Sequence, residues 1–225
     1  MLVSLVSGEN IFPSETVSPN PLKTVCISGH REKSIIPYMN DISYRTLTLN
    51  TVRLMLYRYI DMAEEYGFEY FISGLATGTD LWASNYIIRK KTDGSNIKFI
   101  GAVPFLRHAE FFPESSLSTL SYIEKNSDYL VTTCEDENAH YYKGSPLYRK
   151  RNYYMVDKSS AVIAFLNDDK HVSGTAQTVN YAYKNGKKIY KFSIDDVYKI
   201  IDSAGTDIQK IGKEISSMKN VFMSQ

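Results

Sequence analysis

Residues 71–83 read FISGLATGTDLWA, and the fold class can be predicted from them. The apolar start closes a short run typical of a buried strand, Glu69–Ser73. The glycine-rich residues 74–79 follow, and a helical pattern then covers Asp80–Lys90 with Thr79 as candidate N-cap. A strand, a glycine-rich turn and a helix in this order predict one unit of a parallel sheet with crossover helices.

The same unit recurs along the chain. Strands are predicted at Thr24–Ile27, Glu69–Ser73, Ile97–Val103, Tyr129–Thr133, Ala161–Leu166 and Lys188–Phe192, and helices at Tyr44–Tyr66, Asp80–Lys90, Leu117–Asn126, Leu147–Val156, Gly174–Tyr183 and Asp195–Met218. Residues 161–166 are continuously apolar, as expected for a strand covered on both faces. We therefore predict an α/β fold in three layers with a mostly parallel central sheet.

The two ends differ in character from the middle. Residues 1–22 carry three of the seven prolines with several Ser and Asn, so we expect an irregular N-terminal extension with one short strand at Met1–Val6. Residues 23–194 form the predicted ligand-binding domain, and residues 195–225 form a helical tail.

Charge and composition narrow the function classes. The 225 residues hold 26 Lys and Arg against 25 Asp and Glu, a net charge of +1 that gives no general field for nucleic acid or membrane. The sequence has no apolar run near the roughly 20 residues of a membrane span, and its start lacks the basic segment of a signal peptide. We read Cys26 and Cys134 as reduced thiols of a cytoplasmic protein. The aromatic content of 13% fits a core, an oligomer interface or base stacking.

Ligands of open parallel sheets bind beyond the carboxyl ends of the strands, and small or polar residues follow the predicted strands at these places. They are Ser28-Gly29-His30-Arg31, residues 73–80, Pro104-Phe105 and Ser173-Gly174-Thr175. Helix N-termini there would offer free amides to an anion, worth about 0.3–1 kcal/mol for each exposed interaction. The sequence therefore predicts an anion-binding cleft at this edge.

Each of these features has a second interpretation. Glycines after strands also serve as turn residues, Asp80 suits the first turn of a helix, and Trp82 is favoured as a core residue over a stacking surface. The loop at 73–80 is neither a P-loop nor a dinucleotide fingerprint. No triad or metal-ligand spacing occurs in the sequence, so we expect no metal site.

Five motifs occur together in one order. They are Ser28-Gly29-His30-Arg31, residues 71–83, Ala102-Val103-Pro104-Phe105, residues 151–159 and residues 173–182. In this order the chain resembles the YpsA-like branch of the SLOG superfamily, from about Lys23 to Phe192. The resemblance implies a Rossmann-like three-layer sandwich with a nucleotide-type ligand at the glycine loops. Its members include DprA-type single-strand DNA binders, LOG phosphoribohydrolases, and sensors of nucleotide-derived signals.

The LOG enzymes provide a test of enzyme against binder. Arg151-Asn152-Tyr153-Tyr154-Met155 is similar to their Arg-Lys-x-x-Met segment, but Thr178 stands where the resemblance calls for the Glu that serves bond cleavage. An oxocarbenium-like transition state needs a carboxylate, which threonine lacks. Asp80 or Asp157 is the substitute that the sequence offers. We therefore expect a binding protein rather than an enzyme. If the protein is an enzyme, we expect it to hydrolyse a nucleotide N-glycoside bond.

The leading prediction is binding of a nucleotide or nucleotide-derived small molecule, sensed or sequestered, with no cofactor. The expected ligand-binding residues are Gly29, His30, Arg31, Ser73, Gly74, Gly78, Asp80, Pro104, Phe105, Arg151, Asn152, Asp157, Ser173, Gly174 and Thr175. Amides of the glycines would hold phosphate, and the three basic residues would add charge-assisted hydrogen bonds. Phe105 or a neighbouring Tyr would stack on a base, and Asp80 would hold a ribose hydroxyl.

Two alternatives stay open. One is a LOG-type nucleotide N-glycoside or phosphoribosyl hydrolase. The other is DprA-like binding of single-stranded DNA, which the near-neutral charge does not favour. Similar folds commonly self-associate, so a homo-oligomer is a further expectation.

Overall fold

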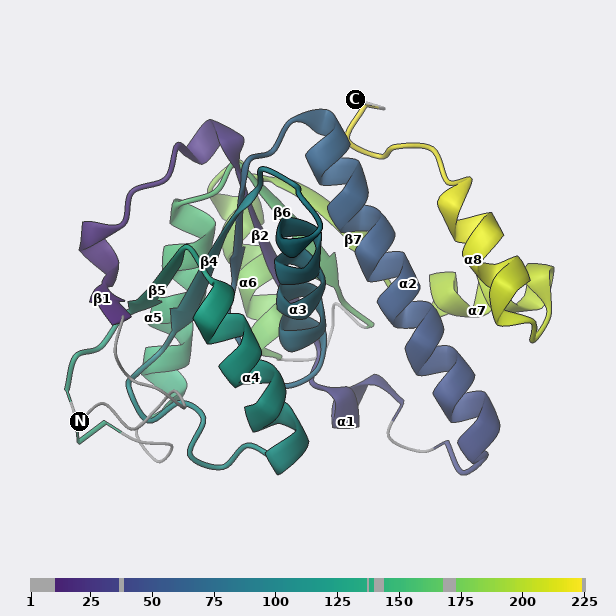
Figure 1. Cartoon of the computed structure of the whole chain (residues 1–225), viewed down its shortest axis with the longest axis horizontal. Helices are drawn as coiled ribbons and strands as arrows, with labels where there is room; N and C mark the ends of the chain where they lie inside the picture. The colour runs from purple at the N-terminus through teal and green to yellow at the C-terminus, as the bar shows by residue number, and fades with distance from the viewer. Residues whose placement is uncertain (1–10, 37–38, 137, 140–143, 168–172, 224–225) are drawn as a thin grey trace.

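The computed structural model describes residues 11–36, 39–136, 138–139, 144–167 and 173–223, which fold around a seven-stranded sheet (Figure 1). The strands are β1 (Ile11–Pro13), β2 (Thr24–Gly29), β3 (Tyr70–Ser73), β4 (Lys98–Val103), β5 (Tyr129–Thr132), β6 (Ala161–Phe165) and β7 (Lys188–Phe192). They lie in the order β1-β5-β4-β3-β2-β6-β7, and every neighbouring pair is parallel. The predicted Rossmann-like α/β sandwich is confirmed.

Helices cover both faces of the sheet (Figure 1). They are α1 (Glu32–Ile35), α2 (Ile42–Tyr66), α3 (Thr79–Thr92), α4 (Glu114–Asn126), α5 (Gly144–Asp157), α6 (Gly174–Lys184), α7 (Ile194–Ala204) and α8 (Ile208–Ser216). In β2, Val25 and Ile27 pack into the core beneath α2 and α3, whereas Cys26 packs with residues of α5 and α6, because successive strand residues point to opposite faces. None of the helices in the described ranges is long and apolar enough to cross a membrane.

The strand order reverses next to β2. From β2 the chain runs through β3 and β4 to β5 on one side, and α5 then returns it to β6 on the other side. Ligands of such sheets bind in the crevice at this switch point, outside the carboxyl ends of the strands. The topology therefore locates the first place to look for a site at the ends of β2 and β6.

The elements differ from the predicted ones at several places, among them the short helix α1, which was not predicted. Residues Ile11–Pro13, inside the predicted extension, form the edge strand β1 beside β5, while the strand expected at Met1–Val6 lies outside the described residues. Gly78, and not Thr79, occupies the N-cap position of α3, and the Thr79 hydroxyl instead donates to the His30 carbonyl. The predicted helix at 195–218 is divided into α7 and α8, since Gly205 ends the first with a positive φ of 74°.

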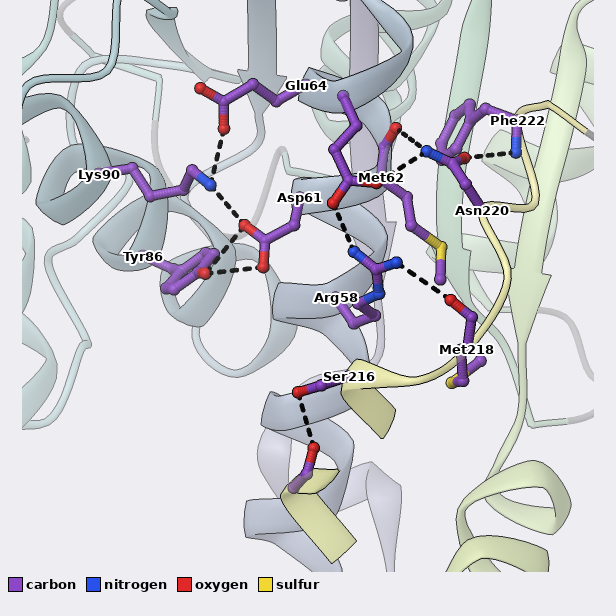
Figure 2. A network of polar contacts seen from close by, with 12 residues as sticks. Arg58, Asp61, Met62, Glu64, Tyr86, Lys90, Ser216, Met218, Asn220 and Phe222 are labelled. Atoms are coloured by element: carbon purple, nitrogen blue, oxygen red, sulfur yellow. Dashed lines mark hydrogen bonds and ion pairs between the residues drawn. The ribbon is translucent and has the colours of Figure 1, made fainter. Parts of the chain in front are cut away.

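The C-terminal residues pack into the domain against α2 (Figure 2). Arg58 Nη2 donates to the Met218 carbonyl at 3.0 Å, and Asn220 Nδ2 donates to the Met62 carbonyl at 2.8 Å. These bonds place Phe222, which is 1% exposed, in an aromatic cluster with residues of α2 and β7. The end of the predicted tail is therefore part of the core.

Polar contacts also tie α3 to the other flank of α2 (Figure 2). Lys90 Nζ lies 2.5 Å from Asp61 and 2.6 Å from Glu64, and the Tyr86 hydroxyl donates to the Asp61 carboxylate. These partly buried pairs position α3, and with it the glycine-rich loop at its N-terminus.

We expect Phe222→Ala to lower the free energy of unfolding by about 3–5 kcal/mol, because the substitution opens a cavity in a closed aromatic cluster. The matched control is Met223→Ala at the next position, where the side chain is 62% exposed and the effect should stay within about 0.5 kcal/mol. Urea unfolding measures both values. Equal losses in the two variants would contradict the burial of Phe222.

Candidate ligand-binding site

A cavity of about 290 Å³ lies at the carboxyl edge of the sheet. Five segments form its wall: the end of β2, α1, the junction of β3 and α3, the middle of α5 and the N-terminus of α6. Nine of the predicted site residues line it: Gly29, His30, Arg31, Asp80, Arg151, Asn152, Ser173, Gly174 and Thr175. The switch point in strand order brings these distant segments together.

Among the described residues that line this cavity, Asp80 is the acidic one, and it is 5% exposed. Its carboxylate accepts hydrogen bonds from the amides of Gly29, at 3.3 Å, and Ala76. Burial raises the pKa of Asp80 from 3.8 to about 6, although the charge of Arg151 and the two amides oppose this shift. A carboxyl group that titrates near neutral pH is suited to proton transfer.

The described residues contain no group of three or more His, Cys, Asp or Glu side chains that could hold a metal ion. The hydrogen-bond partners that hold the Asp80 carboxyl group are backbone amides. The Gly29 amide is among these donors, whereas we expected it to hold a phosphate.

Arg151 connects three segments at the base of the cavity and is 4% exposed. Its Nη1 donates to the carbonyl oxygens of Gly74 and, at 3.3 Å, Ala102, and its Nε donates to Asn152 Oδ1 at 2.8 Å. A Cβ atom at Gly74 would collide with the guanidinium, so a larger residue there would displace Arg151 from this contact. Gly74 thus contributes its carbonyl to the arginine, and a phosphate contact of its amide stays a prediction.

The N-terminus of α6 supplies backbone donors to the cavity. Ser173 caps the helix by accepting from the Ala176 amide at 3.0 Å. The amides of Gly174 and Thr175, in the first turn, have no acceptor within the helix. A helix end of this kind attracts an anion through its free N–H groups and its dipole.

Thr178 lies one turn further along α6 and is fully buried. Its hydroxyl donates to the Gly174 carbonyl at 2.8 Å. The position at which the resemblance calls for a carboxylate therefore contributes a hydrogen bond within the helix.

His30 lines the same cavity in a neutral form. Its Nε2 accepts the Asn167 amide hydrogen at 3.1 Å, which assigns the ring proton to Nδ1. Burial lowers the pKa of His30, so the ring stays uncharged at neutral pH. The structure favours a neutral donor at His30 in place of the charged one that we expected.

A second cavity of about 680 Å³ adjoins the first, and Arg31, Ser34 and Tyr148 line both. Its wall also includes Gly78, whose φ of +92° and 2.5 Å approach of an added Cβ to a backbone nitrogen require glycine. Trp82, for which we favoured a core position, is half-buried, packs against the core and lines this cavity. The candidate site thus has two connected parts.

Tyr148, and not Phe105, is the aromatic ring at the junction of the two cavities. Phe105 is 1% exposed and packs edge-on against His108 and Tyr148, so its faces are covered. Tyr148 is half-buried, and the Cζ atoms of Arg31 and Arg151 each lie 5.9 Å from its ring centroid. Sequence reasoning missed Tyr148, although it precedes Arg151 by one helical turn and so shares a helix face with it.

Four predicted residues line neither cavity: Gly74, whose carbonyl contacts Arg151, and Ser73, Pro104 and Asp157. The Ser73 hydroxyl donates to the Asp80 carbonyl at 3.1 Å and supports the loop from within. Pro104 is buried, and its carbonyl accepts from the Thr133 hydroxyl. Asp157 lies at the C-terminus of α5, toward the opposite edge of the sheet, where it accepts from the Tyr181 hydroxyl at 3.0 Å. Asp157 is therefore not a carboxylate of this site.

The loop between β3 and α3 contains a strained residue. Leu75 is fully buried and has a positive φ of 55°. Its carbonyl lies 3.2 Å from His108 Nε2, which must be the donor because a carbonyl only accepts. Burial, with the charge of Arg151, lowers the pKa of His108 to about 3. His108 is therefore neutral, with a lone pair at Nδ1.

Comparison with known proteins gives matches across the region that contains both cavities. The YpsA model, described as the YspA SLOG family, matches residues 25–198. A UPF0398 protein of Macrococcus caseolyticus (strain JCSC5402) is 23% identical over 185 residues, which cover 80% of this chain and 96% of that protein. UPF0398 proteins of Bacillus cereus (strain G9842) and Bacillus thuringiensis (strain Al Hakam) are 20% identical over 149 residues, covering 66% of this chain and 77% of theirs. Every residue that lines the smaller cavity falls within the family match.

The titration of Asp80 predicts a pH-dependent stability. Between pH 4 and 6, approximately, the folded chain keeps a proton on Asp80 that the unfolded chain has lost, so rising pH destabilises the fold across this window and not above it. As the pH rises through this window, the free energy of unfolding of the wild type should fall by roughly 3 kcal/mol more than that of Asp80→Asn, because each pKa unit corresponds to about 1.4 kcal/mol. Urea unfolding of both proteins across this range measures the difference, in which the contributions of other groups cancel. A difference that does not change with pH would show that Asp80 titrates normally.

Proposed function

Because this chain belongs to the YspA SLOG family, we propose that it binds a nucleotide or nucleotide-derived small molecule at the carboxyl edge of its sheet. The observation that carries the proposal is that Arg31, Tyr148 and the N-terminus of α6 line one cavity. They supply a guanidinium, an aromatic ring and backbone amides, the groups that recognise phosphate and base. The ligand is sensed or sequestered rather than converted.

The N-terminus of α6 and Arg31 support the phosphate part of the proposal. The Gly174 and Thr175 amides have no acceptor within the helix, and the α6 dipole favours an anion beside them. Arg31 is exposed, and no carboxylate of the described residues lies within ion-pair distance of it. Arg151 is instead bonded to backbone carbonyls. Arg31 is therefore the guanidinium that can form two parallel bonds to a phosphate.

Tyr148 and Asp80 support the nucleoside part. The Tyr148 ring borders both cavities, so a base in either one can pack against it. The Asp80 carboxylate lines the smaller cavity and has acceptor capacity beyond its bonds to the Gly29 and Ala76 amides. A ribose hydroxyl is a suitable donor to it.

Thr178 favours binding over cleavage. It has no ionisable group near neutral pH, and its hydroxyl is engaged with Gly174 inside α6. Cleavage of an N-glycosidic bond needs a carboxylate to stabilise positive charge or move a proton.

A nucleotide N-glycoside hydrolase is the second candidate function, and Asp80 is the observation that favours it. Asp80 is a buried carboxyl group in the candidate cavity, and its pKa of about 6 is near that of a working acid or base. In this alternative Asp80 takes the role for which Thr178 is unsuited.

We expect Arg31→Ala to weaken the binding of nucleoside mono- and diphosphates by about 10- to 100-fold, the effect of losing hydrogen bonds between charged groups. Lys150→Ala is the matched control, since it removes the same charge from an exposed position that lines neither cavity. Isothermal titration calorimetry measures both affinities. If no nucleotide binds the wild-type protein, or if the two variants lose affinity equally, the proposed site is wrong.

The two candidate functions differ in their products. Incubation of the wild-type protein with the common nucleoside monophosphates, followed by chromatography, should leave them intact. The hydrolase alternative instead requires that the wild type releases free base, and that Asp80→Asn lowers the rate of this release by about 100-fold or more. Base released by the wild type and lost in this variant would replace the binding-only proposal.

A further inference from the structure

The larger cavity is lined by several basic and several aromatic side chains, more than the binding of a single phosphate group requires. In the described part of the chain its basic side chains are Arg31, Lys33, Arg53 and Arg107, against one acidic residue, Glu32. Arg107 is paired with Glu110, which leaves an excess of positive charge. Its aromatic side chains are Trp82, Phe105, Phe111, Phe112, His108 and Tyr148. A planar ligand that carries negative charge matches this lining.

Two side chains of this cavity hold buried polar atoms without a partner in the described part of the chain. Arg53 packs its guanidinium 4.2 Å from the centre of the Trp82 ring, and its Nε has no acceptor. His108 is 4% exposed, and its Nδ1 has no donor. Buried polar groups are normally hydrogen-bonded, so an unsatisfied donor and an unsatisfied acceptor on side chains of one cavity are consistent with a polar ligand there. The heterocycle of a nucleobase offers both kinds of group.

The two cavities meet at a positive junction. Tyr148 and Arg31 line both, and the Arg31 guanidinium lies 5.9 Å from the ring centroid. The smaller cavity, at about 290 Å³, is at the lower limit of the roughly 300–1,000 Å³ of small-molecule pockets. The larger one, at about 680 Å³, has room for a whole second unit of the ligand.

We propose that the ligand is two-ended, with two nucleoside-like rings joined by a phosphate linker. One end occupies the smaller cavity, the linker lies beside Arg31 and Tyr148, and the second ring occupies the larger cavity near Trp82. This inference rests on the proposed function and specifies its ligand class. A dinucleoside polyphosphate has the required chemistry, because its anionic linker matches the junction and its second base matches the aromatic, basic lining.

The first experiment compares ligands that differ only in the second nucleoside. Calorimetry with the full chain uses adenosine and guanosine diphosphates against diadenosine and diguanosine diphosphates. The two-ended probe of at least one pair should bind at least 10-fold more tightly than its one-ended partner. Trp82 is the sole tryptophan of the chain and lines the larger cavity, so its fluorescence reports directly on occupancy there. Only the two-ended probe should change it strongly.

A blocking variant tests the location of the second end. Ser116 on α4 is half-buried and lines the larger cavity, so Ser116→Phe should fill part of it. Ser118→Phe, two positions along the same helix at an exposed site outside the cavity, is the matched control. Ser116→Phe should reduce the affinity of the two-ended probe to that of the one-ended probe and leave the latter unchanged. Neither substitution adds a tryptophan, so the fluorescence readout is kept.

The outcomes separate this inference from the proposed function. Equal affinities for one- and two-ended probes, with unchanged Trp82 fluorescence, would overturn the two-ended ligand and leave nucleotide binding intact. Full quenching of Trp82 by a nucleoside diphosphate alone would also overturn it, because one nucleotide would then fill the larger cavity. If no probe binds, both proposals fail. Should Ser116→Phe not fold, the test of the two-ended ligand is the change in wild-type Trp82 fluorescence with the two-ended probe compared with the one-ended probe.

Discussion

The candidate site depends on a buried guanidinium bonded to backbone carbonyls. Arg151 of α5 donates to Gly74 at the end of β3 and to Ala102 in β4, so one side chain connects a helix to two neighbouring strands. Removing a cation from water costs several kcal/mol, which the carbonyls and the charge of Asp80 offset. The glycine at position 74 is the steric condition for this contact. Arg151 is thus a residue that builds the cavity as well as lining it.

Asp80 determines which backbone donors remain for a ligand. Its carboxylate already accepts from the Gly29 and Ala76 amides, so the chain provides its own anion at the loops after β2 and β3. The N-terminus of α6 and Arg31 are left to attract an external anion. This division distinguishes the arrangement from a loop that surrounds phosphate with glycine amides.

Much of the fold follows from the sequence, because strand and helix periods are local properties and parallel strands share one carboxyl edge. The shared carboxyl edge of parallel strands is enough to predict that Gly29 and Gly174 lie together. It does not show which side chains are buried or how far along a helix a residue lies. Asp157 follows Arg151 by six residues, about 9 Å along the axis, and this distance carries it toward the opposite edge. Phe105 does follow a strand, but neighbouring rings cover it. A three-residue edge strand such as β1 is too short for any periodic signal.

The left-handed backbone at Leu75 has a consequence for how the cavities bind. This conformation costs a leucine roughly 1–2 kcal/mol, and it persists only because the surroundings determine it. The Ser73 hydroxyl, the His108 ring and close packing with β4 hold the residue from three sides. A loop held in this way cannot relax to an easier shape when the cavities are empty. A ligand of the proposed kind would therefore meet a loop whose shape is already set, and little conformational entropy of this loop would be lost on association.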